Sequence, residues 1–268
     1  MNINLFSKEL KRNRKTLLIW MGISSLFTIV VTAFYPTISS MGEGLNMIMS
    51  TLPPQITKAM GMDISTWSSI MGFYSTYYKI YIIILISIFT TYTATQIISK
   101  EERESTSEFL LTKPISRKSV FTTKILALAS LSMIIFLTQV AVAYVGVILF
   151  SQKPVLWSLF FRLHLEGVLL MGIFTGFGLV VSQFTNPKRS LIGLVIGLTF
   201  GTNLLSALSK LTPSTEWLGY ISPFNYLELS ASNPEETINL IIAAIFFIII
   251  VLTVVVAGKK FILRDIGT

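Results

Sequence analysis

The sequence predicts an all-α integral membrane protein, and three observations support that fold class. Hydrophobic residues make up 52% of the 268 residues and charged residues only 13%, whereas soluble domains carry about 25% charged residues. The mean hydropathy is +0.71. Apolar runs of spanning length recur along the chain, and no polar stretch between them is long enough for a separate water-soluble domain. We therefore predict a single transmembrane domain over residues 1–268.

Residues 1–16 combine a basic cluster with apolar residues at helical spacing. Ile3, Phe6, Leu10 and Leu17 recur at the spacing of one helix face. This pattern predicts either an amphipathic helix lying in the membrane interface or a plain basic anchor that sets topology. The apolar run that follows has spanning length and no small-residue cleavage site, so a cleavable signal peptide is not expected.

Six apolar runs are long enough to cross a membrane, since a span needs roughly 20 predominantly apolar residues. Pro36 closes the first run. Lys79 lies near the outer end of the second run and is expected to snorkel to water, and Lys124 is expected beyond the hydrocarbon at the inner end of the third. The predicted spans are residues 17–35, 76–98, 122–150, 159–184, 190–208 and 237–257.

Two long connections lie on the side away from the termini. Residues 36–75 are weakly charged and predict one or two short helices at the outer surface. Residues 209–236 end in Asn-Pro-Glu-Glu at 233–236, which predicts a helix cap, a proline in the first turn and acids beside it. The same connection carries aromatic rings of the kind that sit at headgroup level: Trp217, Tyr220, Phe224 and Tyr226.

The basic residues are distributed unequally between the two sides, and the formal net charge is +8. All 21 Lys and Arg residues fall on the side of the termini except Lys58, Lys79, Lys153, Arg162 and Lys210. The positive-inside rule therefore predicts that both termini are cytoplasmic. These charges flank apolar runs, so we expect them to meet the lipid bilayer and not nucleic acid. The chain has no cysteine, which excludes disulfides and thiolate metal sites.

Residues 101–117, EERESTSEFLLTKPISR, form a polar segment between the second and third spans. Acids crowd its first half, an apolar triplet follows, and Pro114 stops a helix because its ring disfavours the αR conformation of the preceding residue. The segment is either a short helix that meets a partner or an ordinary solvated loop. Glu104 and Glu108 stand at i and i+4 and repel each other in an isolated helix, a strain that a basic partner surface would relieve.

The segment resembles the cytoplasmic loop of ABC-2 type transporter permeases. Its pattern there is an acid, Gly-Thr, one residue, Glu, two or three leucines, two residues and Pro-Ile-Ser-Arg. The matching residues here are Ser105–Thr106, Ser107, Glu108, Phe109–Leu111, Thr112–Lys113 and Pro114–Arg117. Ser105 replaces the Gly that is usual in the family. In the second outer connection, Ser222-Pro223-Phe224 resembles the sequence that the family has at this place.

In that family the segment is a coupling helix that docks into a groove of a separate ATPase subunit. The resemblance thus assigns docking to Glu104, Thr106, Glu108, Phe109, Leu110, Leu111, Pro114 and Arg117. It also implies an interfacial N-terminal helix beside the ATPase, and short helices that re-enter the outer leaflet before the last span.

The function implied is that of the membrane subunit of a bacterial ABC exporter in the plasma membrane. Its cargo would be amphipathic or hydrophobic, such as a peptide antibiotic, a drug or a lipid, and its partners would be cytoplasmic ATPase subunits and a second permease copy or paralogue. No GxxxxGK[ST] motif occurs, so ATP and Mg²⁺ are expected on the partner and no cofactor on this non-catalytic chain. An alternative is a related complex that senses peptides or regulates other membrane proteins with little transport.

Arg162, His164 and Glu166 lie at the start of the fourth span, at the outer end where water is within reach. Arg162 and Glu166 stand at i and i+4, so they either pair on one helix face or form a polar intramembrane site for a proton or cation with His164. An intramembrane enzyme using His164 and Glu166 is a further alternative, which their i, i+2 spacing opposes. The single histidine excludes a multi-histidine metal site, and an ion-coupled carrier would need charges at mid-membrane depth.

Two rows of glycine at spacing four occur in the fourth and fifth spans. Such rows let helix backbones approach closely. They predict packing within the subunit or, alternatively, a dimer seam. The rows are Gly172 and Gly176, and Gly193, Gly197 and Gly201.

Overall fold

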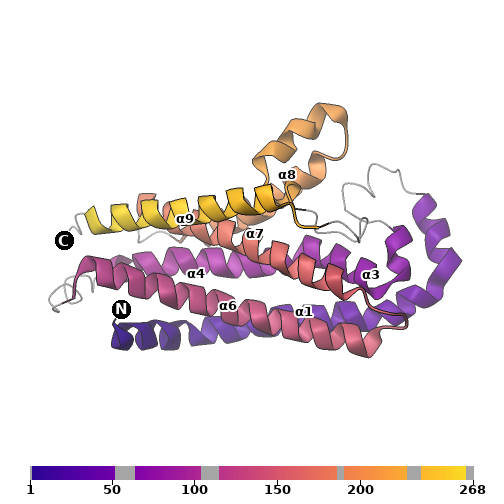
Figure 1. Cartoon of the computed structure of the whole chain (residues 1–268), viewed down its shortest axis with the longest axis horizontal. Helices are drawn as coiled ribbons and strands as arrows, with labels where there is room; N and C mark the ends of the chain where they lie inside the picture. Colours follow the sequence, from indigo (N-terminus) through magenta and orange to yellow (C-terminus); the bar gives the residue numbers. More distant parts are fainter. Residues whose placement is uncertain (1, 52–63, 104–114, 186–189, 228–236, 264–268) are drawn as a thin grey trace.

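The fold is a bundle of helices laid along one long axis, with the two ends of the chain at the same end of the bundle (Figure 1). The computed structural model describes residues 2–51, 64–103, 115–185, 190–227 and 237–263. Within these ranges every regular element is a helix, which confirms the predicted class. Five helices there are long and apolar enough to span a membrane: Ile3–Met41, Ile70–Lys100, Arg117–Phe150, Trp157–Phe184 and Leu240–Leu263.

Helix α1 runs without interruption over Ile3–Ser50. Residues 3–16 therefore belong to the same helix as the first span, and the predicted interfacial helix is not confirmed as an element of its own. The predicted end at Pro36 is wrong. Proline removes one backbone hydrogen bond but does not end a helix whose neighbouring turns are held by packing. Here Tyr35 is buried, and its hydroxyl donates to the Ser68 carbonyl at 3.2 Å.

The second span is the central element of the bundle. It comprises α3 (Ile70–Tyr77), the π-helical turn η2 (Tyr78–Ile82) and α4 (Ile83–Arg103). In the most apolar 18-residue stretch of this span, 83% of the residues are buried, against 11% in the corresponding stretch of the last span, α9 (Leu240–Leu263). The Ser69 hydroxyl caps α3 by accepting from the Gly72 N–H at 3.1 Å.

Helices α6 (Arg117–Phe150) and α7 (Trp157–Phe184) pack on the central span together with α1, and α9 packs on α7 and α6. Gly172 and Gly176 of α7 lie against α9, because a Cβ at these positions would collide with Ile250 and Thr253. This glycine pair therefore lies in the contact between α7 and α9.

Helix α8 (Ile192–Leu208) replaces the predicted fifth span and has only 17 residues, about 25 Å of helix. That length falls short of a hydrocarbon core of about 30 Å, so six spans are not confirmed. In Figure 1 the region of α8 stands out from the side of the bundle. No described atom lies within 4 Å of a Cβ built at Gly193, Gly197 or Gly201, so the described part of the subunit does not pack on this row.

The two connections predicted to lie outside contain short 3-10 helices: η1 (Ile64–Ser68), η3 (Pro213–Ile221) and η4 (Pro223–Asn225). Trp217 and Tyr220 are exposed, as expected of headgroup-level rings. Phe224 is instead fully buried, with its ring centroid 5.4 Å from that of Phe174, so it belongs to the core. Residues 233–236 lie outside the described ranges, and the side chain of Asn239 caps α9 by accepting from the Ile241 and Ile242 N–H groups.

Candidate functional site at the basic end of the bundle

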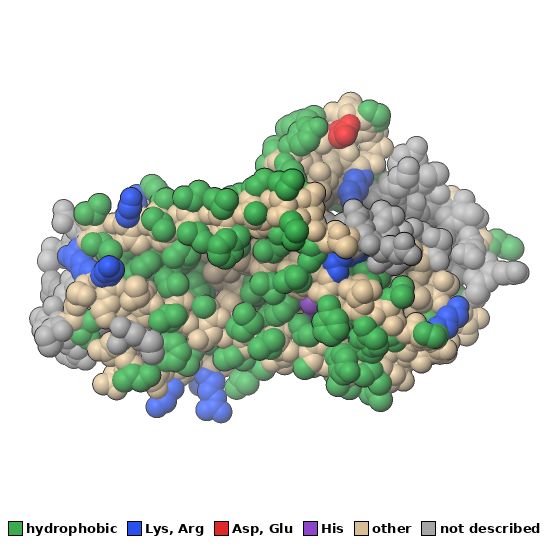
Figure 2. All heavy atoms as spheres, in the orientation of Figure 1, with side chains coloured by type: hydrophobic (Ala, Val, Ile, Leu, Met, Phe, Trp, Pro, Cys, Tyr) green, Lys and Arg blue, Asp and Glu red, His purple; other side chains and the backbone are tan. Residues whose placement is uncertain are grey.

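The basic end of the bundle is the end where α1 and α6 begin and where α4 and α9 end. Figure 2 shows several Lys and Arg side chains over this end. The basic residues of these four helix ends are Lys8, Lys11, Arg12, Arg14, Lys15, Lys100, Arg103, Arg117, Lys118, Lys259 and Lys260. The helices therefore bring together charges that the sequence scatters over more than two hundred positions.

The predicted coupling segment lies between two of these helix ends. Residues 104–114, and with them every predicted docking residue except Arg117, lie outside the described residues. The flanks are described: α4 ends at Arg103, and α6 begins at Arg117 under a Ser116 cap that accepts from the Ser119 N–H at 3.2 Å. Arg117 Nη1 donates to the Ile262 carbonyl of α9 at 3.2 Å, so the exit of the segment is tied to the last helix.

A buried ion pair joins three helices next to these flanks. Lys124 Nζ of α6 lies 3.2 Å from Glu9 Oε1 of α1, and both side chains are fully buried. The same ammonium group donates to the Ile97 carbonyl of α4 at 2.5 Å. The residue just before Lys124 in α6 is Thr123, and its Oγ1 accepts from the Asn2 N–H at 3.0 Å. The starts of α1 and α6 and the end of α4 are therefore fixed together about 10 Å from the coupling segment.

The prediction from sequence missed this pair. Lys124 was expected beyond the hydrocarbon, but it is buried inside the bundle. The available signal was weak: Glu9 is the only acid before Glu43, in the middle of a basic cluster. This pattern alone does not show that Glu9 faces inward, although a buried charge requires a partner.

A second polar cluster lies on α7. Arg162, His164 and Glu166 are 7%, 4% and 3% exposed, so the expectation that water is within their reach is wrong for the described structure. His164 Nδ1 lies 2.7 Å from the Phe160 carbonyl, which can only accept, so Nδ1 carries the proton. In a neutral imidazole Nε2 then accepts from the Tyr74 hydroxyl, 3.1 Å away.

The π-helical turn η2 faces this cluster. The Tyr78 ring centroid lies 4.9 Å from that of His164, and its hydroxyl lies against Gly167, where a Cβ would collide with it. Lys79 in the same turn is 9% exposed, and its expected snorkelling to water stays a prediction. Single π-helical turns are frequent at functional sites. The pairing and the proton or cation interpretations both remain predictions, and no group of three metal-ligating side chains gathers among the described residues.

Comparison with protein families decides the class of this molecule. A family model described as ABC-2 family transporter protein matches residues 3–259. The chain belongs to the ABC-2 transporter family. The match extends from the first turn of α1 to the last turns of α9 and includes the whole coupling segment, so the recognition made from residues 101–117 is confirmed. A comparison with curated proteins finds no match.

Membership of the ABC-2 family has two direct consequences for this chain. Such permeases are typically non-catalytic membrane subunits, and they work in ABC transporters together with an ATPase. The multiple apolar helices agree with a membrane protein of this type. Membership of the family therefore indicates that this chain is a permease that takes part in transport across a membrane.

Proposed function

We propose that this chain is the permease subunit of an ATP-driven exporter in a bacterial plasma membrane, working with a separate ATPase. The family match over residues 3–259 is the observation that carries the proposal. The low charge of the spans favours an amphipathic or hydrophobic cargo such as a peptide antibiotic, a drug or a lipid-like molecule. ATP and Mg²⁺ are held by the ATPase, and this chain binds no cofactor of its own.

The basic end faces the cytoplasm in this proposal, because the excess of Lys and Arg there satisfies the positive-inside rule. Residues 104–111 dock into a groove on the ATPase. Phe109, Leu110 and Leu111 supply the buried contact, and Glu104 and Glu108 meet basic residues of the partner. ATP binding then moves this segment as the two ATPase subunits close.

The movement reaches the spans through the Lys124 contacts. A segment attached to freely moving helix ends would only displace loops. Here Lys124 of α6 joins the end of α4, through the Ile97 carbonyl, to α1, through Glu9. Since α4 belongs to the most buried span and packs along α7, displacement of its end shifts packed helices as bodies. Two permease copies facing each other would then open the pathway outward.

Exchange of one docking acid tests the proposal. Glu108→Lys reverses the charge offered to the ATPase, and we expect the amount of ATPase that co-purifies with the permease to fall at least about tenfold. Glu216→Lys makes the same charge change on the exposed surface of η3 and should leave the yield unchanged. Both variants should insert in the membrane at wild-type levels. An unchanged ATPase yield with Glu108→Lys would rule out the docking role.

A further inference from the structure

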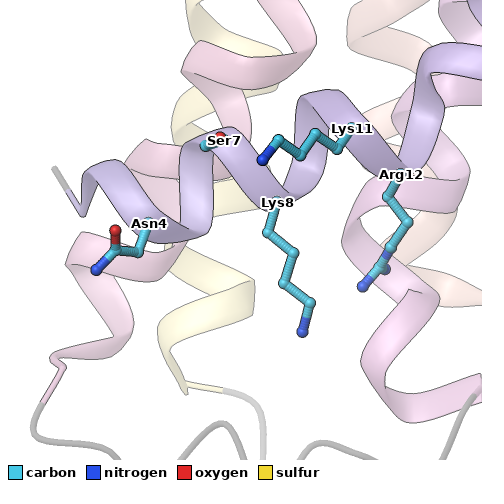
Figure 3. Close-up of a pocket in the computed structure, with 5 residues that line it drawn as sticks. All are labelled: Asn4, Ser7, Lys8, Lys11 and Arg12. Atoms are coloured by element: carbon cyan, nitrogen blue, oxygen red, sulfur yellow. The ribbon is translucent and has the colours of Figure 1, made fainter.

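The first turns of α1 form a basic groove that is separate from residues 101–117. Asn4, Ser7, Lys8, Lys11 and Arg12 line an open groove of about 530 Å³ (Figure 3). They recur at steps of three and four residues and so share one face of the helix. Figure 3 shows the long side chains of Lys8 and Arg12 reaching to the same side of α1. The groove offers two ammonium groups, a guanidinium, an amide and a hydroxyl.

The same face of α1 continues from the groove as an apolar stripe. Lys11, Lys15, Leu18 and Gly22 follow one another at steps of three and four and are all exposed. Beyond them the exposed apolar side chains are Ile19, Ile23, Leu26, Ile29, Val30 and Phe34. From Leu18 to Phe34 the stripe is about 24 Å long, which exceeds half of a hydrocarbon core of about 30 Å.

The opposite face of α1 is turned into the bundle. Leu5, Leu17 and Tyr35 are buried there, and Glu9 makes its ion pair with Lys124. Lys8, Lys11 and the stripe therefore lie on the side of α1 that the described part of the subunit leaves uncovered, whereas Arg12 is partly buried at the edge of that side.

This arrangement matches the two parts of one phospholipid molecule. Phosphate oxygens accept charge-assisted hydrogen bonds from Lys and Arg, and Asn4 and Ser7 can bond the neutral polar groups of a headgroup. Lys11 lies about 10 Å from Leu18 along the helix, so a bound phosphate leaves its acyl chains at the start of the apolar stripe. A soluble anion or an acidic protein segment would contact the basic groove and would leave the apolar stripe uncovered.

We propose that Lys8 and Lys11 bind the phosphate of an anionic phospholipid whose acyl chains lie along the Leu18–Phe34 face of α1. The lipid holds the first turns of α1 from outside the bundle, while Glu9 holds the same turns from inside. This site involves neither the ATPase nor the coupling segment, so it stands or falls independently of the proposed function.

Lipid titration of the full-length permease tests the site. The protein is purified in a neutral detergent, stripped of lipid and titrated with phosphatidylglycerol or phosphatidylcholine of identical acyl chains, and bound lipids are counted by native mass spectrometry. We expect tighter binding of phosphatidylglycerol. Lys8→Gln/Lys11→Gln should weaken that binding about thirtyfold, since each of the two basic residues near a membrane surface contributes about 1 kcal/mol. Binding of phosphatidylcholine should not change.

Matched controls separate this site from general charge effects. Lys118→Gln/Lys259→Gln removes the same charge from exposed positions at the same end and should keep the preference for phosphatidylglycerol. Lys8→Arg/Lys11→Arg should keep it too, which shows that the groove variant fails through lost charge and not through misfolding. Glycerol 3-phosphate, tested as a soluble phosphate, should not displace the lipid.

Four results would overturn the proposal. They are equal binding of the two lipids, equal losses in the groove variant and the control, displacement by glycerol 3-phosphate at matched concentration, and unchanged lipid binding in a groove variant that loses its ATPase. The third would indicate a site for a soluble anion, and the fourth a protein as the occupant.

Discussion

At the residue scale, Lys124 holds three helices at one point, and its ion pair with Glu9 is enclosed by the bundle. The cost of removing a buried charge comes mainly from the partner that stays behind. Lys124→Met should leave the Glu9 carboxylate without its ammonium partner and lower the free energy of unfolding by about 3–5 kcal/mol. The midpoint of thermal unfolding of the purified permease, followed by tryptophan fluorescence, measures the loss.

The double variant Glu9→Leu/Lys124→Met is the internal control for this prediction. Replacing both charges by apolar side chains of similar volume is often neutral, so the double variant should regain most of the lost stability. If the single variant unfolded at the wild-type temperature, the pair would contribute nothing to the joint between α1, α4 and α6.

The same pair shows that contacts between residues of different helices could not be predicted from the sequence. Glu9 and Lys124 are 115 positions apart, and each alone looks like a residue of a solvated helix end. Their burial depends on how α1 packs along α6, which no local pattern encodes. His164 is similar: its Tyr74 partner comes from another helix, so the sequence could mark the residue but not its surroundings.

At the element scale, two glycine rows with the same spacing have different surroundings. Gly176 lies against Thr253 of α9, whereas Gly197 has no described neighbour within 4 Å. Gly176→Leu should therefore force α7 from α9 and lower the unfolding midpoint, because overpacking typically costs about 1–3 kcal/mol. Gly197→Leu should leave that midpoint of the monomer unchanged. Thermal unfolding of the two variants side by side measures the difference.

The α8 variant carries a second prediction about assembly. If the open glycine face of α8 is the seam of the proposed permease dimer, Gly197→Leu should reduce the dimer fraction, and size-exclusion chromatography with light scattering measures that fraction. Gly193→Ala, a far smaller addition on the same face, is the mild comparison. A full dimer fraction in Gly197→Leu would place the seam on another surface.

Helix boundaries show where the sequence predicts elements and where it does not. Long apolar runs predicted α6, α7 and α9 closely, because composition decides whether a segment can stay in a membrane. The predicted end at Pro36 was wrong, whereas the helix predicted over residues 190–208 is present as α8 but is not confirmed as a span. Packing carries α1 through its proline, and α8 ends after 17 residues even though its composition would suit a span.

At the scale of the whole molecule, the uneven distribution of basic residues in the sequence corresponds to one end of the helical bundle. The helix ends that carry most of the basic residues meet at one end, which is also the end where the chain starts and finishes (Figure 1). The sequence could predict the family from residues 101–117 because that pattern is local. It could not supply the geometry of docking, which depends on a surface of another polypeptide.

The polarity itself can be tested directly, because the chain has no native cysteine. A single cysteine introduced as Lys118→Cys lies at the exposed start of α6 at the basic end, and one introduced as Ser214→Cys lies on the exposed surface of η3. A membrane-impermeant maleimide added to intact cells should label Ser214→Cys at once. It should label Lys118→Cys only after the membrane is opened, because the positive-inside rule holds the basic end in the cytoplasm. The reverse pattern would put the coupling segment outside the cell, where no ATP-hydrolysing partner could reach it, and the exporter mechanism would fail while the family assignment stood.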